Sequence, residues 1–177
     1  LTFLYYNYRE FENLRVVYDD LDKLFKTEVF YSKRLLANYY SNRAMMHSKL
    51  NELALAEKFG YLSIRQKNSD YLFYLANLCG VLLRSGKYDK ALKVMSSSIP
   101  ELKKTNSFYN KIGFASFYTR TLVYNKMAKN AVSYANTFLD AYKKEIFETR
   151  WHLFFTAYLQ ALLSAEKYSQ ILSVAKR

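Results

Sequence analysis

The stretch LANLCGVLLRSGKYDKAL, residues 75–92, decides the fold of this chain. Apolar and small residues recur at helical spacing on both sides of Ser85 and Gly86, and Gly86 suits the left-handed backbone that ends a helix. The stripe before these two residues consists of Leu72, Leu75, Ala76, Cys79, Leu82 and Leu83, and the stripe after them of Tyr88, Ala91, Leu92, Met95 and Ile99. We predict two antiparallel helices joined by a two-residue loop, the first beginning at Asp70.

The composition of the whole chain favours helix. The 177 residues include 51% hydrophobic and 24% charged side chains, with only 4 Gly and 1 Pro, too few for the tight turns of a β-sandwich or barrel. Leu occurs 25 times against 13 for Val plus Ile, which also favours helix. A single Cys excludes a disulfide scaffold or a Cys-built zinc site. No apolar run is long enough to span a membrane, so we expect no membrane insertion.

The stretch 75–92 resembles the tetratricopeptide repeat. That family places a large residue, then Leu and a small residue three and four positions later, then a turn with Gly and an aromatic residue, and then Ala. Here these positions are occupied by Leu75, Leu78, Cys79, Gly86, Tyr88 and Ala91, followed by Met95 and Ser98. Cys79 stands where the family usually has Gly, and Pro100 lies three residues before the family's proline.

The same pattern recurs along the chain. Taking Ala91 as the marker, equivalent positions fall at Leu14, Ala56, Ala131 and Ile171, with spacings of 42, 35, 40 and 40 residues. The resemblance implies an all-α fold, a right-handed α-solenoid of antiparallel helical hairpins forming a TPR-like superhelix. We expect one repeat array over residues 1–177, with a partial repeat at 1–28 and repeats at about 37–68, 69–106, 107–146 and 147–177. Neither end reads as a capping repeat, so we expect a fragment of a longer protein.

The sequence holds no catalytic motif. The glycines are isolated, and no phosphate-binding loop, HExxH motif or nucleophile elbow is present. His47, His152 and Cys79 fall at positions where packing is the simpler explanation. We therefore expect a protein that is not an enzyme and uses no cofactor or metal.

The resemblance also implies where a ligand would bind. In this family the first helix of each repeat lines a concave groove, and the matching positions give a predicted peptide-binding groove. Its residues are Asn38, Asn42, Met45, Phe73, Asn77, Phe117, Arg120 and Gln160, together with Leu83, Val123 and Thr156. Asn42 and Asn77 share one repeat position, and their amides suit a peptide backbone; alternatively, they cap local turns or face water.

The net charge of +12 favours acidic partners. It is uneven, because residues 1–30 carry a net −2 (4 basic, 6 acidic) and the rest +14 (23 basic, 9 acidic). Most of the lysines fall on turns or second helices, and only Arg120 lies on the predicted concave track, with Arg43 and Arg84 near its edge. A protein that reads RNA with helical repeats would place its basic residues along that track, so nucleic acid is not the expected partner.

These observations favour a non-catalytic scaffold that binds a protein or peptide segment in the concave groove, and the net charge favours an acidic segment. An alternative is the regulatory domain of a bacterial transcription regulator or peptide-pheromone receptor, because such proteins often join these repeats to a helix-turn-helix segment. A third alternative is nucleic-acid binding by the basic convex face, which steep salt dependence would reveal. One Cys and no export signal favour the cytoplasm; the oligomeric state and the ligand are not readable from the sequence.

Overall fold

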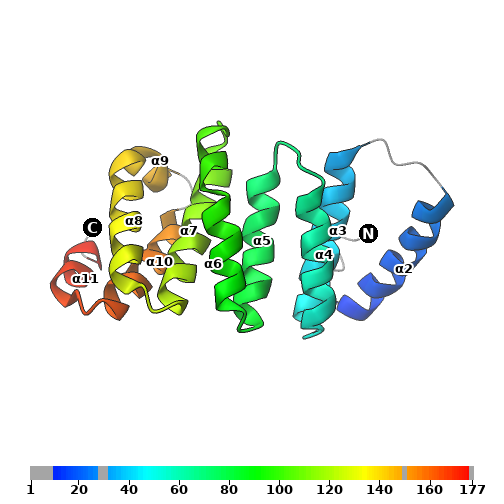
Figure 1. The fold of residues 1–177 in the computed structure, drawn as a ribbon, viewed down its shortest axis with the longest axis horizontal. Coiled ribbons are helices and arrows are strands. Elements are labelled where there is room, and N and C mark those ends of the chain that lie inside the picture. The colour runs from blue at the N-terminus through cyan, green and yellow to red at the C-terminus, as the bar shows by residue number, and fades with distance from the viewer. Residues whose placement is uncertain (1–9, 28–31, 149–150, 176–177) are drawn as a thin grey trace. The chain divides into compact units, whose positions relative to one another are not determined.

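The computed structural model describes residues 10–27, 32–148 and 151–175, and every secondary-structure element in those ranges is helical (Figure 1). The predicted all-α class is therefore confirmed for this part of the chain. The chain divides into two compact units, Leu1–Ser85 and Gly86–Arg177. Among the described helices none is both long and apolar enough to cross a membrane.

The first unit contains four described helices, which pack in chain order. They are α2 (Phe11–Thr27), α3 (Lys33–Lys49), α4 (Leu53–Arg65) and α5 (Tyr71–Arg84). α3 lies along α4, α5 contacts both, and α2 contacts α3 (Figure 1). Gly60 permits the close approach of α4 to α5, since a Cβ at this position would lie 2.7 Å from Cδ1 of Leu78. The only cysteine, Cys79, is buried on α5 with 1% exposure.

The second unit contains one 3-10 turn and six described α-helices. They are α6 (Tyr88–Ser97), the turn η1 (Ile99–Lys103), α7 (Phe108–Tyr124), α8 (Ala128–Ala141), α9 (Lys143–Glu148), α10 (Trp151–Ser164) and α11 (Tyr168–Ala175). α7 contacts α6, α8 and α10, and α10 contacts α8 and α11. Aromatic rings fill the centre of this unit: Phe138 of α8 lies 5.2 Å from Phe154 of α10, measured between ring centroids.

The same left-handed backbone conformation recurs after four of the helices, α3, α5, α7 and α10. Asn51, Gly86, Lys126 and Glu166 have φ values of 62°, 69°, 61° and 58°. Each lies two residues after the end of its helix, at spacings of 35, 40 and 40 residues, five residues before a predicted marker. Three of the markers, Ala56, Ala91 and Ala131, have no exposed surface. The predicted left-handed Gly86 is confirmed, and the turns follow the predicted spacing.

Two predicted boundaries differ from the structure. α5 begins at Tyr71 rather than Asp70, because the Asn68 side chain accepts a hydrogen bond from the Asp70 backbone N–H and forms a turn before the helix. α6 ends at Ser97, so Ile99 leaves the predicted stripe and lies 37% exposed. The reason is Pro100, which has no backbone N–H to continue the α-helical hydrogen bonds and whose ring clashes with the carbonyl four residues before it. The right-handed stacking of all hairpins and the repeat limits stay predictions.

We predict opposite stability effects at two of the equivalent turns. Gly86→Ala places a Cβ in the left-handed region and lowers the free energy of unfolding by about 1–2 kcal/mol. Lys126→Gly removes the same strain and raises it by up to about 1 kcal/mol. Urea unfolding followed by circular dichroism measures both changes.

The matched control is Lys93→Gly, at an exposed position inside α6, where the extra backbone freedom of Gly lowers stability by about 1 kcal/mol. If Lys126→Gly is as destabilising as Lys93→Gly, the turn conformation is not a source of strain.

Candidate functional site

The predicted groove residues lie on first helices of both units. Asn38, Asn42 and Met45 are on α3 and Phe73 and Asn77 on α5, whereas Phe117 and Arg120 are on α7 and Gln160 is on α10. Each unit therefore brings together its own part of the predicted set, and the two parts are described separately.

In the first unit, the two predicted amides lie in different surroundings. The Asn77 side-chain amide donates a 3.0 Å hydrogen bond to the Ser41 hydroxyl, which ties α5 to α3. Asn42 is exposed, as is Asn38 one turn before it. Met45 and Phe73 are half-buried. One of the two predicted amides thus joins neighbouring helices, and the other is available to solvent.

In the second unit, Arg120 joins α7 to α10. Its guanidinium donates a 3.1 Å hydrogen bond to the Thr156 hydroxyl and lies 5.8 Å from the centroid of the Phe117 ring. Arg120 is half-buried, and its Nε–H is buried without an acceptor among the described residues. The charge is therefore held in place by a neutral hydroxyl and an aromatic ring.

Two apolar side chains missed by the sequence reasoning extend this surface. Tyr124 lies one turn after Arg120 and is 43% exposed, and Leu163 follows Gln160 by three residues and is 59% exposed. Their helical spacing from predicted residues was the signal that would have found them. We call this surface the α7–α10 face; it consists of Phe117, Arg120, Tyr124, Thr156, Gln160 and Leu163.

Arg43 is not near a groove edge, contrary to the sequence-based expectation. It is 6% exposed and forms ion pairs with Asp22 and Asp19 of α2, and its guanidinium lies 4.4 Å from the centroid of the Phe59 ring. The Tyr39 hydroxyl donates to Asp22 and accepts from Arg43. Burial, with the Asp22 hydrogen bond, raises the pKa of Tyr39, so the phenol stays protonated. Acidic residues of α2 thus compensate a buried cation.

A second polar link holds the same helices. His47 Nδ1–H donates to a Glu52 carboxylate oxygen at 2.5 Å, and the other oxygen accepts from Arg15 of α2 at 2.5 Å. The His47 ring stacks on Phe59 with 5.2 Å between centroids. The hydrogen bond from His47 lowers the pKa of Glu52, and the charge of Arg15 adds to this effect. His47 therefore has a structural role.

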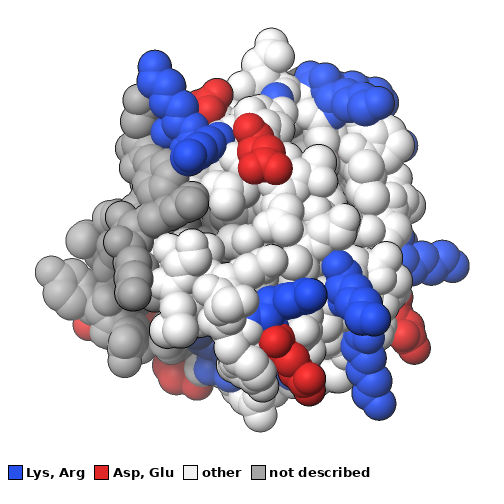
Figure 2. Space-filling model, turned by 90° about the vertical axis from the view of Figure 1, so that its left-hand side faces the viewer, with Lys and Arg blue, Asp and Glu red and all other residues white. Residues whose placement is uncertain are grey.

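Several of the described basic residues lie on helices other than the predicted first helices. Exposed lysines of this kind, on α6, α8 and α9, are Lys90, Lys93, Lys129, Lys143 and Lys144. On the face shown in Figure 2, Lys and Arg side chains lie in several separate groups, some with Asp or Glu side chains beside them. No cluster of His, Cys, Asp and Glu suited to a metal ion occurs in the described ranges.

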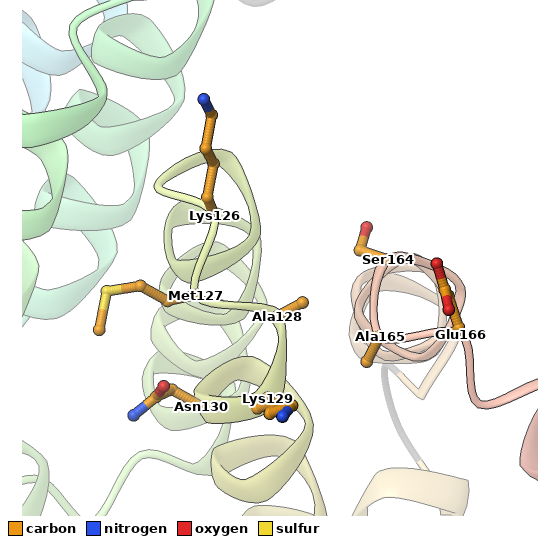
Figure 3. A pocket seen from close by; sticks show the side chains of 8 residues that line it. All are labelled: Lys126, Met127, Ala128, Lys129, Asn130, Ser164, Ala165 and Glu166. Atoms are coloured by element: carbon orange, nitrogen blue, oxygen red, sulfur yellow. The ribbon is translucent and has the colours of Figure 1, made fainter.

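An opening of about 400 Å³ lies between the α7–α8 and α10–α11 turns (Figure 3). Its lining comprises residues 126–130 and 164–166. In that view the Met127 and Asn130 side chains point away from the α10–α11 turn, and the Lys126 side chain points upward. These three side chains do not converge in the way of the groups that orient a small molecule.

Comparison with family models, curated proteins and solved structures found no match to this chain.

We predict that the Glu52 link makes stability pH-dependent. Because the folded pKa of Glu52 is lowered, its contribution is fully present above the ordinary Glu range near 4.5 and is lost as the pH falls through the folded value. Glu52→Gln lowers the free energy of unfolding at pH 7 by about 1 kcal/mol, because the amide forms weaker hydrogen bonds than the carboxylate. Between pH 5 and pH 3 the free energy of unfolding of this variant falls less than that of the wild type. Urea titrations at several pH values measure this.

The control for this prediction is Glu12→Gln. The Glu12 carboxylate is 74% exposed and lies 3.4 Å from the same Arg15, so removing its charge changes stability by less than about 0.5 kcal/mol. Equal acid dependence in the wild type and in Glu52→Gln would contradict the role assigned to Glu52.

Proposed function

We propose that this chain is a non-catalytic binding module that holds an acidic peptide segment on the α7–α10 face. The observation that carries the proposal is the environment of Arg120. Arg15, Arg34 and Arg43 each pair with a carboxylate of a neighbouring helix. Arg120 has only the Thr156 hydroxyl and the Phe117 ring, and no described carboxylate pairs with it.

An incoming carboxylate would complete the environment of Arg120. The Thr156 hydroxyl fixes the guanidinium, so little side-chain freedom is lost when a ligand binds. Charge-assisted hydrogen bonds from a guanidinium are stronger than neutral ones, particularly beside apolar surface that displaces water. The overall charge of +12 also attracts an acidic segment.

The rest of the α7–α10 face suits apolar contacts beside that carboxylate. Tyr124 and Leu163 are exposed at 43% and 59%, and Phe117 is half-buried next to Arg120. Gln160, half-buried on α10, offers an amide that can both donate and accept. We therefore expect a ligand with Asp or Glu close to an aromatic or Leu side chain.

A solenoid of stacked hairpins would place further first helices beside the α7–α10 face. Within each unit, the main contacts join helices that are close in the repeat order: α3, α4 and α5 in the first unit, and α7, α8, α10 and α11 in the second. That pattern supports the predicted tetratricopeptide-like stacking. Under it, Asn38, Asn42 and Phe73 would extend the same groove.

A random peptide library displayed on phage, selected on the immobilised protein, tests the function. Enriched peptides should share a carboxylate next to an apolar residue. Synthetic copies should bind Arg120→Gln about 10-fold or more weakly, because a charged hydrogen bond contributes about 1.5–3 kcal/mol, and should bind Phe117→Ala more weakly as well. Fluorescence anisotropy with labelled peptides measures the dissociation constants.

Arg65→Gln is the matched control, because Arg65 is an exposed arginine at the end of α4. It should leave the dissociation constant unchanged, and circular dichroism should show equal helicity for all variants. Enriched peptides that bind Arg120→Gln and Phe117→Ala as tightly as the wild type would refute the proposed face.

A further inference from the structure

The outer side of α11 exposes two large apolar side chains. Tyr168 and Leu172 lie one helical turn apart and are 59% and 63% exposed. On an adjacent side of the same helix, Ile171 and Val174 pack against the core of the second unit. α11 is therefore apolar on two sides, of which one is covered by the described residues.

The preceding hairpin shows that this side of a second helix is a packing surface. Val132 of α8 lies 40 residues before Leu172, at the same repeat position, and is only 8% exposed. It belongs to the same core as Phe154 of α10, the helix that contacts α8. The equivalent residue of α6, Leu92, also packs against this core. A helix laid across Tyr168 and Leu172 would thus repeat a contact that the chain already makes.

The first unit carries a helix whose chemistry complements this surface. On α2, Glu12, Val16 and Asp20 are spaced by four residues and share one side of the helix. Val16 is 61% exposed, and the Glu12 and Asp20 side chains are 74% and 67% exposed while pairing within α2 to Arg15 and Lys23.

The N-terminal segment and the rest of the chain carry opposite net charges. Residues 1–30 carry a net −2, whereas the rest of the chain carries +14. At the α11 surface, exposed Lys167 adjoins Tyr168 and follows exposed Glu166. On α2, Val16 lies between two acidic residues, which can approach Lys167.

We propose that the α11 surface of Tyr168 and Leu172 binds the Glu12–Val16–Asp20 side of α2 of a second copy of this chain. Because the two surfaces differ, the contact is heterologous, and each bound copy leaves one surface of each kind available for another. The contact uses no residue of the α7–α10 face and is independent of the proposed peptide binding.

Sedimentation velocity on the full chain tests this contact. The weight-average mass of the wild type should rise with concentration between about 1 and 200 μM, the range of affinity for a modest interface. Leu172→Gln and Val16→Gln, each of which places a polar side chain in the contact, should each reduce association by about 10-fold. Leu35→Gln is the matched control, because Leu35 is an equally exposed leucine on α3, at 61%, and should associate like the wild type.

Mixing the two variants separates a heterologous contact from a symmetric one. A 1:1 mixture of Leu172→Gln and Val16→Gln retains one intact pair of surfaces, α11 of the Val16 variant and α2 of the Leu172 variant, and should form dimers that neither variant forms alone. A wild type that stays monomeric at about 200 μM would overturn the proposal. If Val16→Gln associates as strongly as the wild type, α11 pairs with α11 and the proposal is wrong. A 1:1 mixture of the two variants that does not associate would also overturn it.

Discussion

The turn that follows each first helix is the constraint on which the remaining structure depends. Two residues beyond α3, α5, α7 and α10 the backbone enters the left-handed region, and the next helix begins shortly after. A left-handed residue ends a helix because its N–H, and that of its successor, satisfy the last carbonyls; Glu52, Met127 and Lys167 N–H bond carbonyls five residues back. Only Gly86 adopts this conformation without steric cost, so the other three turns are maintained by the packing of the helices that they join.

The sequence was sufficient to predict the features that depend on local spacing. Helical class, the left-handed Gly86 and the buried markers Ala56, Ala91 and Ala131 all follow from periodicity and from glycine's backbone freedom. The partners of polar side chains were not predictable in this way. Arg43 pairs with Asp22, 21 residues away, and Asn77 with Ser41, 36 residues away, and no local pattern specifies such distances. The same limit applied to Tyr124 and Leu163, whose exposure depends on which helices cover them.

Three side-chain hydrogen bonds join neighbouring hairpins across the same separation in sequence. Arg34 to Asp70, Asn77 to Ser41 and Arg120 to Thr156 each span 36 residues, which places equivalent positions of successive first helices side by side. Each link contributes modestly where it is exposed to water. Their shared spacing has a larger effect, since a shift of one helix by a turn would break all links of that unit together. The Arg120 link differs from the Arg34 link because its acceptor is a neutral hydroxyl, and no carboxylate in the described part of the chain pairs with Arg120.

The burial of Cys79 gives the chain an intrinsic reporter of local opening. The chain has no other thiol, and the side chain is 1% exposed on α5. An alkylating reagent reaches the sulfur only when α5 separates from its neighbours, so the labelling rate follows the opening equilibrium of that helix rather than the reactivity of a surface group. The opening of the first unit can thus be timed in the native chain without introducing a label.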